Sequence, residues 1–286
     1  MAKRYAKKQY YTSRGSAAAE RREKLIKLIA IIVVLAVAAV IAFVVFDKEK
    51  KEHDAVAKLS ERRKLTGLAY YPQKVDIDNR LAAGFVPDDL TYLYTIPEGT
   101  GLQLVKEAAD AYTNMHNAMA ANGLSVVILD AYISYNDQVA RYNAQIAMYM
   151  ADGYSQQIAA DKTLKVMELP GADEHQLGYS LDLSTNGKKQ SGFLTTDQGE
   201  WLQRHAHEYG FIFRYPESKR FVTGVDGEPW HIRYVGKDAA TYMVKYDLCL
   251  EEYIELAKKE SPKAVPQQNY TGDTIVSVEY VSKTDA

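Results

Sequence analysis

Apolar residues are uninterrupted in one stretch near the N-terminus and recur at helical or strand spacing in the rest of the chain. The stretch, LIAIIVVLAVAAVIAFVVF, covers residues 28–46 and holds no charged or polar side chain. About 20 such residues cross a hydrocarbon core ~30 Å thick. A cleaved signal peptide would usually have an apolar region of about 7–15 residues followed by a small-residue cleavage site, and the following DKEKKEHD offers no such site. A buried core helix is the other alternative. From the length and the uninterrupted apolar composition, we predict a single transmembrane helix.

Helical and strand-like patterns are mixed between residues 70 and 258. Apolar positions recur at helical spacing from 105 to 119, and Asn122-Gly123 supplies a stop. Ser134 with Asp137 has the pattern of a capping box that opens a second helix. The runs SVVILDAY, YSLDL, FIFRY and WHIRYV are typical of short strands. Because no regular βαβ alternation occurs, the pattern predicts an α+β fold with a small antiparallel sheet and flanking helices.

Charge is unevenly distributed along the chain, although the formal net charge is only −2. Residues 1–27 contain nine basic and two acidic residues, a net charge of +7, whereas residues 47–286 contain 26 basic and 35 acidic residues, a net charge of −9. The cationic head favours a cytoplasmic N-terminus and an extracytoplasmic body, although three lysines just beyond the apolar stretch weaken the bias. We interpret the head as a topology signal and expect no nucleic-acid partner.

These changes of composition define five segments. We predict a basic cytoplasmic segment (1–27), a transmembrane helix (28–46), a charged stalk (47–69), an α+β domain (70–258) and a linker-like tail (259–286). Within the tail, IVSVEYV alternates like a strand. The one cysteine, Cys249, excludes an intramolecular disulfide framework and a cysteine-rich zinc module.

Two motifs combine histidine with a carboxylate. In GADEHQLGYSLDL, strand alternation places Asp182 on the face opposite Leu181 and Leu183, with His175 in the preceding turn. In GEPWHIRYV, Glu228 precedes His231 by three residues, with Pro229 between them. Two histidines and one carboxylate form a zinc set that leaves one position open for water, and a further carboxylate would serve as the base. Chance occurrence is the alternative for motifs this short. We interpret the other histidines as structural or solvent-facing: His53, His116, His205 and His207.

A longer resemblance distinguishes these interpretations. The segments VDIDNRLAAGFVPDDL, AYISYNDQ, LPGADEHQLGYSLDL, EYGFIFRYP and TGVDGEPWHIRYVG follow one another between residues 70 and 250. In this order they resemble the VanY-type D-alanyl-D-alanine carboxypeptidases, which are LAS-type zinc peptidases of the bacterial cell wall. The resemblance implies a small α+β domain with an antiparallel sheet. It also implies an enzyme that removes the terminal D-alanine from peptidoglycan stem peptides.

The family's roles can be transferred to matching positions of this sequence. The resemblance implies that His175, Asp182 and His231 bind Zn²⁺ and that Glu228 is the catalytic base. It also implies that four further residues lie near the substrate: Gln138, Asp173, Trp230 and Ser134.

Two positions depart from the family pattern. Ile133 stands where the family has an arginine, and Asp173 stands where it has a serine. Loss of one cation that stabilises developing negative charge can lower a rate by ~10²–10³. Arg141, Arg214 and Arg233 are candidates to compensate, the last two being more typical of structural residues. Three alternatives follow: a zinc-retaining but catalytically weak peptide-binding domain, a related peptidase with altered specificity, or a structural membrane protein with an accidental set. The sequence leaves the oligomeric state open.

Overall fold

A long apolar helix and an α+β unit make up the part of the chain that the structure describes. The structure is a computed structural model, and it describes residues 22, 24–33, 35–48, 50, 65, 68–93, 99 and 101–267. The chain divides into two units, Met1–Arg63 and Lys64–Ala286. The first contains the helix Lys24–Lys48, whose mean hydropathy of 3.5 makes it apolar enough to cross a membrane. A signal sequence near the N-terminus would have the same properties.

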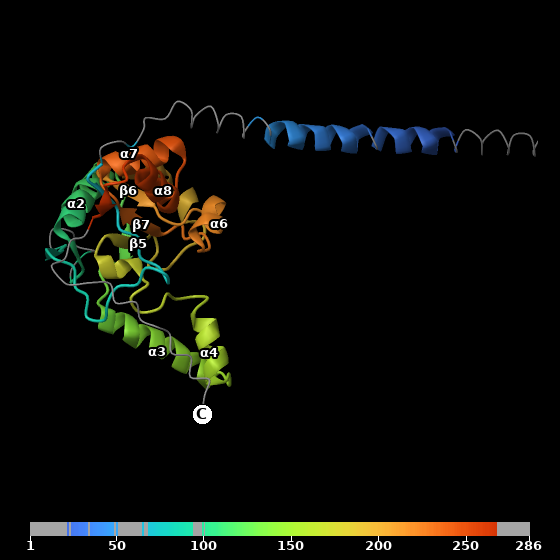
Figure 1. Cartoon of the computed structure of the whole chain (residues 1–286). Coiled ribbons are helices and arrows are strands. Elements are labelled where there is room, and N and C mark those ends of the chain that lie inside the picture. The colour runs from blue at the N-terminus through green and yellow to red at the C-terminus, as the bar shows by residue number, and fades with distance from the viewer. Residues whose placement is uncertain are drawn as a thin grey trace, which may run out of the picture. The chain divides into compact units, whose positions relative to one another are not determined.

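A four-stranded antiparallel sheet forms the centre of the second unit (Figure 1). Its strands are β4 (Val127–Asp130), β5 (Ser180–Ser184), β6 (Phe211–Phe213) and β7 (His231–Tyr234), in the order β4-β5-β7-β6. β4, β6 and β7 fall within the runs that the alternation pattern predicted, β5 extends one residue beyond its run, and the predicted α+β fold class is confirmed.

The two faces of this sheet pack differently. Leu181, Leu183 and Ile232 join the main hydrophobic cluster, together with Tyr112 and Met115 of α2 (Lys106–Ala121). The opposite face carries Asp182, His231 and Arg233, because successive side chains of a strand alternate between faces. The candidate site therefore lies on the face of the sheet that points away from this core.

The remaining helices surround the sheet. α3 (Tyr135–Ala151) and α4 (Gln156–Thr163) contact each other and lie at the end of the unit opposite α7 (Lys237–Tyr246) and α8 (Leu250–Glu260) (Figure 1). Shorter elements complete the path: α5 (Asp197–His205), α6 (Arg220–Thr223), and the 3₁₀ turns η2 (Glu174–Leu177), η3 (Phe193–Thr195), η4 (Ala206–Tyr209) and η5 (Glu217–Lys219). β2 (Leu90–Tyr92) and β3 (Gln103–Val105) form a separate antiparallel pair.

The two ends of the α+β unit meet. β1 (Tyr70–Tyr71) pairs in parallel with β8 (Val265–Pro266). Ser261 Oγ donates a hydrogen bond to the Leu65 carbonyl oxygen at 2.5 Å and accepts one from the Leu68 N–H at 3.0 Å. The first residues of the predicted tail thus pack on the domain. Residues 268–286, including the predicted strand IVSVEYV, and most of the predicted stalk and basic head lie outside the described residues.

Candidate metal centre

Asp182 and His231 face each other across two neighbouring strands. β5 and β7 are antiparallel, with Asp182 directly opposite His231 in the register. Directly opposite residues project their side chains on the same face of the sheet. His231 Nδ1 consequently lies 2.9 Å from Asp182 Oδ1, and both side chains are buried.

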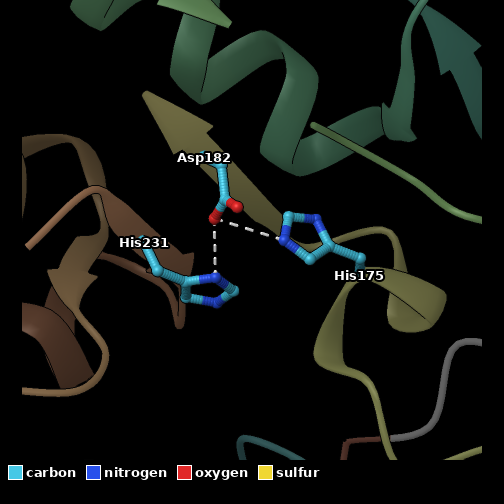
Figure 2. Close-up of side chains that lie close together, drawn as sticks. All are labelled: His175, Asp182 and His231. Atoms are coloured by element: carbon cyan, nitrogen blue, oxygen red, sulfur yellow. Dashed lines mark hydrogen bonds and ion pairs between the residues drawn. The ribbon is translucent and has the colours of Figure 1, made fainter. Parts of the chain in front are cut away.

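His175 reaches the same carboxylate from the turn before β5. It lies in η2, where the Asp173 carboxylate accepts the His175 N–H at 2.7 Å and Gly178, with φ of 72°, ends the turn. The Nδ1 atom of His175 lies 2.7 Å from the carbonyl oxygen of Ala131. Because a carbonyl only accepts, this contact assigns the proton to Nδ1 and leaves the lone pair on Nε2. That Nε2 lies 3.3 Å from Asp182 Oδ1 (Figure 2).

The three side chains have the spacing and chemistry of a metal site. One ligand atom from each of His175, Asp182 and His231 can be chosen so that all lie within 4.8 Å of one another. Tetrahedral zinc with bonds of about 2.0–2.1 Å separates neighbouring ligand atoms by about 3.3 Å. The separation of 3.3 Å between His175 Nε2 and Asp182 Oδ1 equals this value, and the 2.9 Å between His231 Nδ1 and Asp182 Oδ1 is shorter. Two imidazoles and one carboxylate are also a donor set that catalytic zinc sites use.

Electrostatics at the cluster favour positive charge, which protons supply in the metal-free protein and a metal ion would supply in their place. Burial by itself would raise the pKa of Asp182, but the two imidazoles outweigh it and hold that pKa well below its usual value. Burial would lower the pKa of His231, yet the neighbouring carboxylates of Asp182 and Glu174 raise it to about 10. The carboxylates therefore concentrate negative charge around two nitrogen ligands.

Glu228 lies beside the cluster in a tight turn. Its carbonyl oxygen accepts the His231 N–H at 3.1 Å, and its own N–H donates to the Tyr215 carbonyl oxygen at 3.0 Å. The chain thus turns around Pro229, and Glu228 Oε2 lies 3.8 Å from His231 Nδ1. Burial raises the pKa of Glu228. A raised pKa suits a carboxylate that must accept a proton and then return it.

The four residues predicted to lie near substrate have varied surroundings. Gln138 is buried, and its Nε2 donates to the Glu168 carbonyl oxygen at 2.8 Å. Ser134 caps α3 by accepting the Asp137 N–H, and Asp173 caps η2. Trp230 is half-buried, with Lys189 Nζ 5.5 Å from a ring centroid. Three of the four therefore hold backbone groups in place, and contact with substrate stays a prediction for all of them.

Sequence reasoning missed several charged residues at the cluster, among them Lys189 and Glu168. Lys189 Nζ lies 2.9 Å from Asp182 Oδ2, the oxygen that faces away from the histidines. Burial, with Asp173 and Glu228 nearby, raises the pKa of Glu168 to about 7. Neither residue belongs to a recognisable motif, because loops carry both to the site.

The three arginines considered as compensating cations have other partners. Arg141 pairs with Asp130 at 2.8 Å. Arg214 and Arg233 are buried beside Glu174, at 2.8 and 3.5 Å, which agrees with their structural interpretation.

Comparison with known proteins agrees with this geometry. Residues 101–237 match the family model described as VanY, D-alanyl-D-alanine carboxypeptidase. A D-alanyl-D-alanine carboxypeptidase of Enterococcus faecalis is 35% identical over 145 residues, which cover 51% of this chain and 53% of the relative. The chain therefore spans about half the length of this curated relative.

The similarity to two solved structures extends over most of the length of those structures. A vancomycin-resistance D,D-pentapeptidase VanY variant in complex with Zn(II) is 30% identical, with a TM-score of 0.53 over 64% of this chain and 97% of that one. The LD-carboxypeptidase LdcB is 33% identical, with a TM-score of 0.56 over 64% of this chain and 85% of that one. On the ordered motifs, the fold and these matches, the chain belongs to the VanY D-alanyl-D-alanine carboxypeptidase family.

Proposed function

We propose that this protein is a zinc-dependent D-alanyl-D-alanine carboxypeptidase that trims peptidoglycan stem peptides. The observation that carries the proposal is the convergence of His175 Nε2 and His231 Nδ1 on Asp182 Oδ1, at 3.3 and 2.9 Å, with Glu228 beside them. The Zn(II) complex of a VanY relative and the name of the Enterococcus faecalis relative support the choice of metal and substrate.

Each residue of the cluster has a defined task in this proposal. His175, Asp182 and His231 would hold the metal, and zinc bound there would lower the pKa of its water to about 7 and polarise the scissile carbonyl. Glu228 would accept the proton of the attacking water and deliver it to the departing amine of the terminal D-alanine. Trp230 would shape the pocket, and Lys189 would hold the outer oxygen of Asp182.

A second candidate function has its own observation. Ile133 is only 5% exposed, and this apolar side chain supplies no cation where the family has an arginine. A zinc-retaining domain that binds stem peptide with little turnover would be consistent with this substitution. The likeness to LdcB also makes an L,D bond an outcome that the assay must distinguish.

The deciding experiment measures metal content and peptide cleavage on the full-length protein in detergent. We expect about one zinc per chain, lost in His175→Ala and retained in His205→Ala, a surface control whose ring pairs with Glu208. We expect the zinc form to release D-alanine from a pentapeptide ending in D-Ala-D-Ala. Release from the tetrapeptide alone would indicate an L,D-carboxypeptidase, and binding of both peptides without release would establish the weakly catalytic candidate.

We also propose that the helix Lys24–Lys48 anchors the protein in the cell membrane, with the N-terminus cytoplasmic and the catalytic domain outside. Its length, its mean hydropathy of 3.5 and the +7 charge of residues 1–27 support this topology. We expect the full-length chain to stay in the membrane fraction at alkaline pH and external protease to digest the domain. A shortened chain in the soluble fraction would instead indicate a cleaved signal sequence.

A further inference from the structure

Glu174 is a buried carboxylate that the proposed function leaves without a task. It lies in η2 next to His175 and is 2% exposed. Its Oε1 accepts a hydrogen bond from Arg214 Nε at 2.8 Å. Its Oε2 is buried and makes no hydrogen bond.

Three buried polar atoms without a hydrogen bond converge at this place. They are Glu174 Oε2, His231 Nε2 and Arg233 Nη1. Oε2 lies 3.9 Å from His231 Nε2 and 3.5 Å from Arg233 Nη1. Buried polar groups are nearly always paired in folded proteins, so three such atoms in one place point to a contact that tightens in another state of the site.

The chemistry of imidazole identifies that state. A neutral imidazole has one N–H and one lone pair, and a metal ligand must offer the lone pair. If Nδ1 of His231 binds the metal with Asp182 and His175, the proton resides on Nε2. A buried N–H requires an acceptor, and Glu174 Oε2 is the carboxylate oxygen that faces Nε2. Histidine ligands commonly donate their other N–H to a carboxylate in this way.

We propose that Glu174 is a positioning residue for the metal site: its carboxylate accepts the Nε2–H of His231 and thereby turns Nδ1 toward the metal. The inference rests on the proposed function, because it requires that the cluster binds zinc. Glu174 does not touch the metal or the substrate in this proposal.

Two buried arginines keep this carboxylate in place. Arg214 and Arg233 are each at most 2% exposed, and both contact Glu174. Arg214 also binds Glu251 of α8 through Nη1 and Nη2, at 3.0 and 2.5 Å. The Arg214 guanidinium therefore links α8 to Glu174, the carboxylate next to His231. Glu251 is a matched control, because it pairs with Arg214 as Glu174 does but from the α8 side.

The test compares Glu174→Gln with Glu251→Gln in the full-length protein by competition for zinc with a chromophoric chelator. We expect Glu174→Gln to weaken zinc binding about 10–100-fold and Glu251→Gln to weaken it less than about threefold. Both variants lose an ion pair with Arg214, and urea unfolding of the metal-free proteins measures what that loss costs in stability. If the two variants are equally stable but differ in zinc affinity, the difference is assigned to the contact between Glu174 and His231. Equal zinc affinities for the two variants would overturn the inference.

A measurement on the wild type makes the test independent of whether Glu174→Gln folds. Nitrogen-15 NMR of the zinc-loaded protein should show His231 with its proton on Nε2 and in a hydrogen bond. A proton on Nδ1 would overturn the inference while leaving zinc binding intact. A wild type that binds no zinc would instead overturn the proposed function as well.

Discussion

Glu228 combines a fixed backbone with a partly exposed carboxylate. The turn to His231 holds its backbone, and its side chain is 24% exposed, so water and substrate can reach it. Burial raises its pKa and thereby makes it a better proton acceptor than a solvated glutamate.

We predict that Glu228→Gln lowers the rate of D-alanine release by about 10²–10⁴ without loss of zinc, because the amide cannot take the proton of water. Metal content and kcat, measured on the same preparation, check this prediction. Asp226→Asn is the matched control, since Asp226 is an exposed carboxylate in the same loop. Equal losses in both variants would show that loop charge, and not a proton acceptor at position 228, determines the rate.

Glu168 provides a pH-dependent prediction for the metal-free protein. Its pKa in the folded state, about 7, lies above its ordinary value of 4.5 because of burial and because of Asp173 and Glu228. The folded protein thus binds this proton more tightly than the unfolded chain does. The resulting stability is fully present below pH 4.5 and is lost as the pH rises through 7.

As the pH rises from 4.5 to 8, the wild type should therefore lose up to about 3 kcal/mol of unfolding free energy relative to Glu168→Gln, which cannot ionise at this position. Urea unfolding at both pH values, with a chelator present, measures the change. If the two proteins lose stability in parallel, the pKa of Glu168 is the same in the folded and unfolded states, and its surroundings do not raise it.

At the scale of residues, the sequence predicted those parts of the cluster that secondary structure positions. Alternation alone placed Asp182 on the polar face of its strand, and the register of β5 with β7 then brought it opposite His231. Glu174, Glu168 and Lys189 were not predicted, since their approach depends on the path of a turn or loop and on long-range ion pairs.

At the scale of elements, helix α3 begins at a residue with two competing interpretations. The family resemblance predicted that Ser134 contacts substrate, whereas Ser134 Oγ accepts the Asp137 N–H at 3.1 Å and donates to the Asp137 carboxylate at 2.6 Å. This geometry confirms the start of the predicted helix, because an N-cap oxygen satisfies a free N–H of the first turn.

We predict that Ser134→Ala lowers the free energy of unfolding by about 0.5–2 kcal/mol and that Ser134→Thr largely restores it. Ser155, which caps α4 by accepting the Ile158 N–H at 3.4 Å, supplies the matched control Ser155→Ala. If both alanine variants lose stability but only Ser134→Ala raises the KM for pentapeptide, Ser134 has a substrate role in addition to capping. Unchanged stability in Ser134→Ala would contradict the capping role.

The strands could be predicted one by one from the sequence, but the order in which they pair in the sheet could not. The runs that became β4, β5, β6 and β7 alternate clearly, yet nothing in them specifies that β7 lies between β5 and β6. In that order, Leu181 and Leu183 of β5, Ile232 of β7 and Phe211 of β6 share one hydrophobic cluster with α2, a set of long-range contacts that no single run contains. Likewise, the linker-like composition after residue 259 hid β8, whose two residues are too few for a periodic pattern.

At the scale of the whole molecule, the near-neutral net charge conceals a basic head, an apolar helix and an acidic domain. The domain itself is closed by contacts between its two ends. Ser261 is 5% exposed and joins Leu65 and Leu68 to the end of α8, next to the pairing of β1 with β8.

We predict that Ser261→Ala destabilises the domain by about 1–3 kcal/mol, because it leaves the buried Leu65 carbonyl and the Leu68 N–H without their partner. Ser218→Ala, at an exposed position, should have no measurable effect. Thermal unfolding of the two variants compares them directly. A decrease of equal size in both would mean that the contact between the two ends contributes nothing to stability.

The pairing of β1 with β8 also determines how the domain responds to mechanical force. Tension on the N-terminal side of Tyr70 acts along two parallel strands, so it shears their hydrogen bonds together instead of opening them one at a time. Leu65 and Leu68, which precede β1, are also hydrogen-bonded to Glu260 and Ser261 at the end of α8, so tension meets these contacts before it reaches Tyr70. None of these contacts involves the four-stranded sheet that carries Asp182 and His231, so we expect the geometry of the metal centre to persist while the chain before it is pulled.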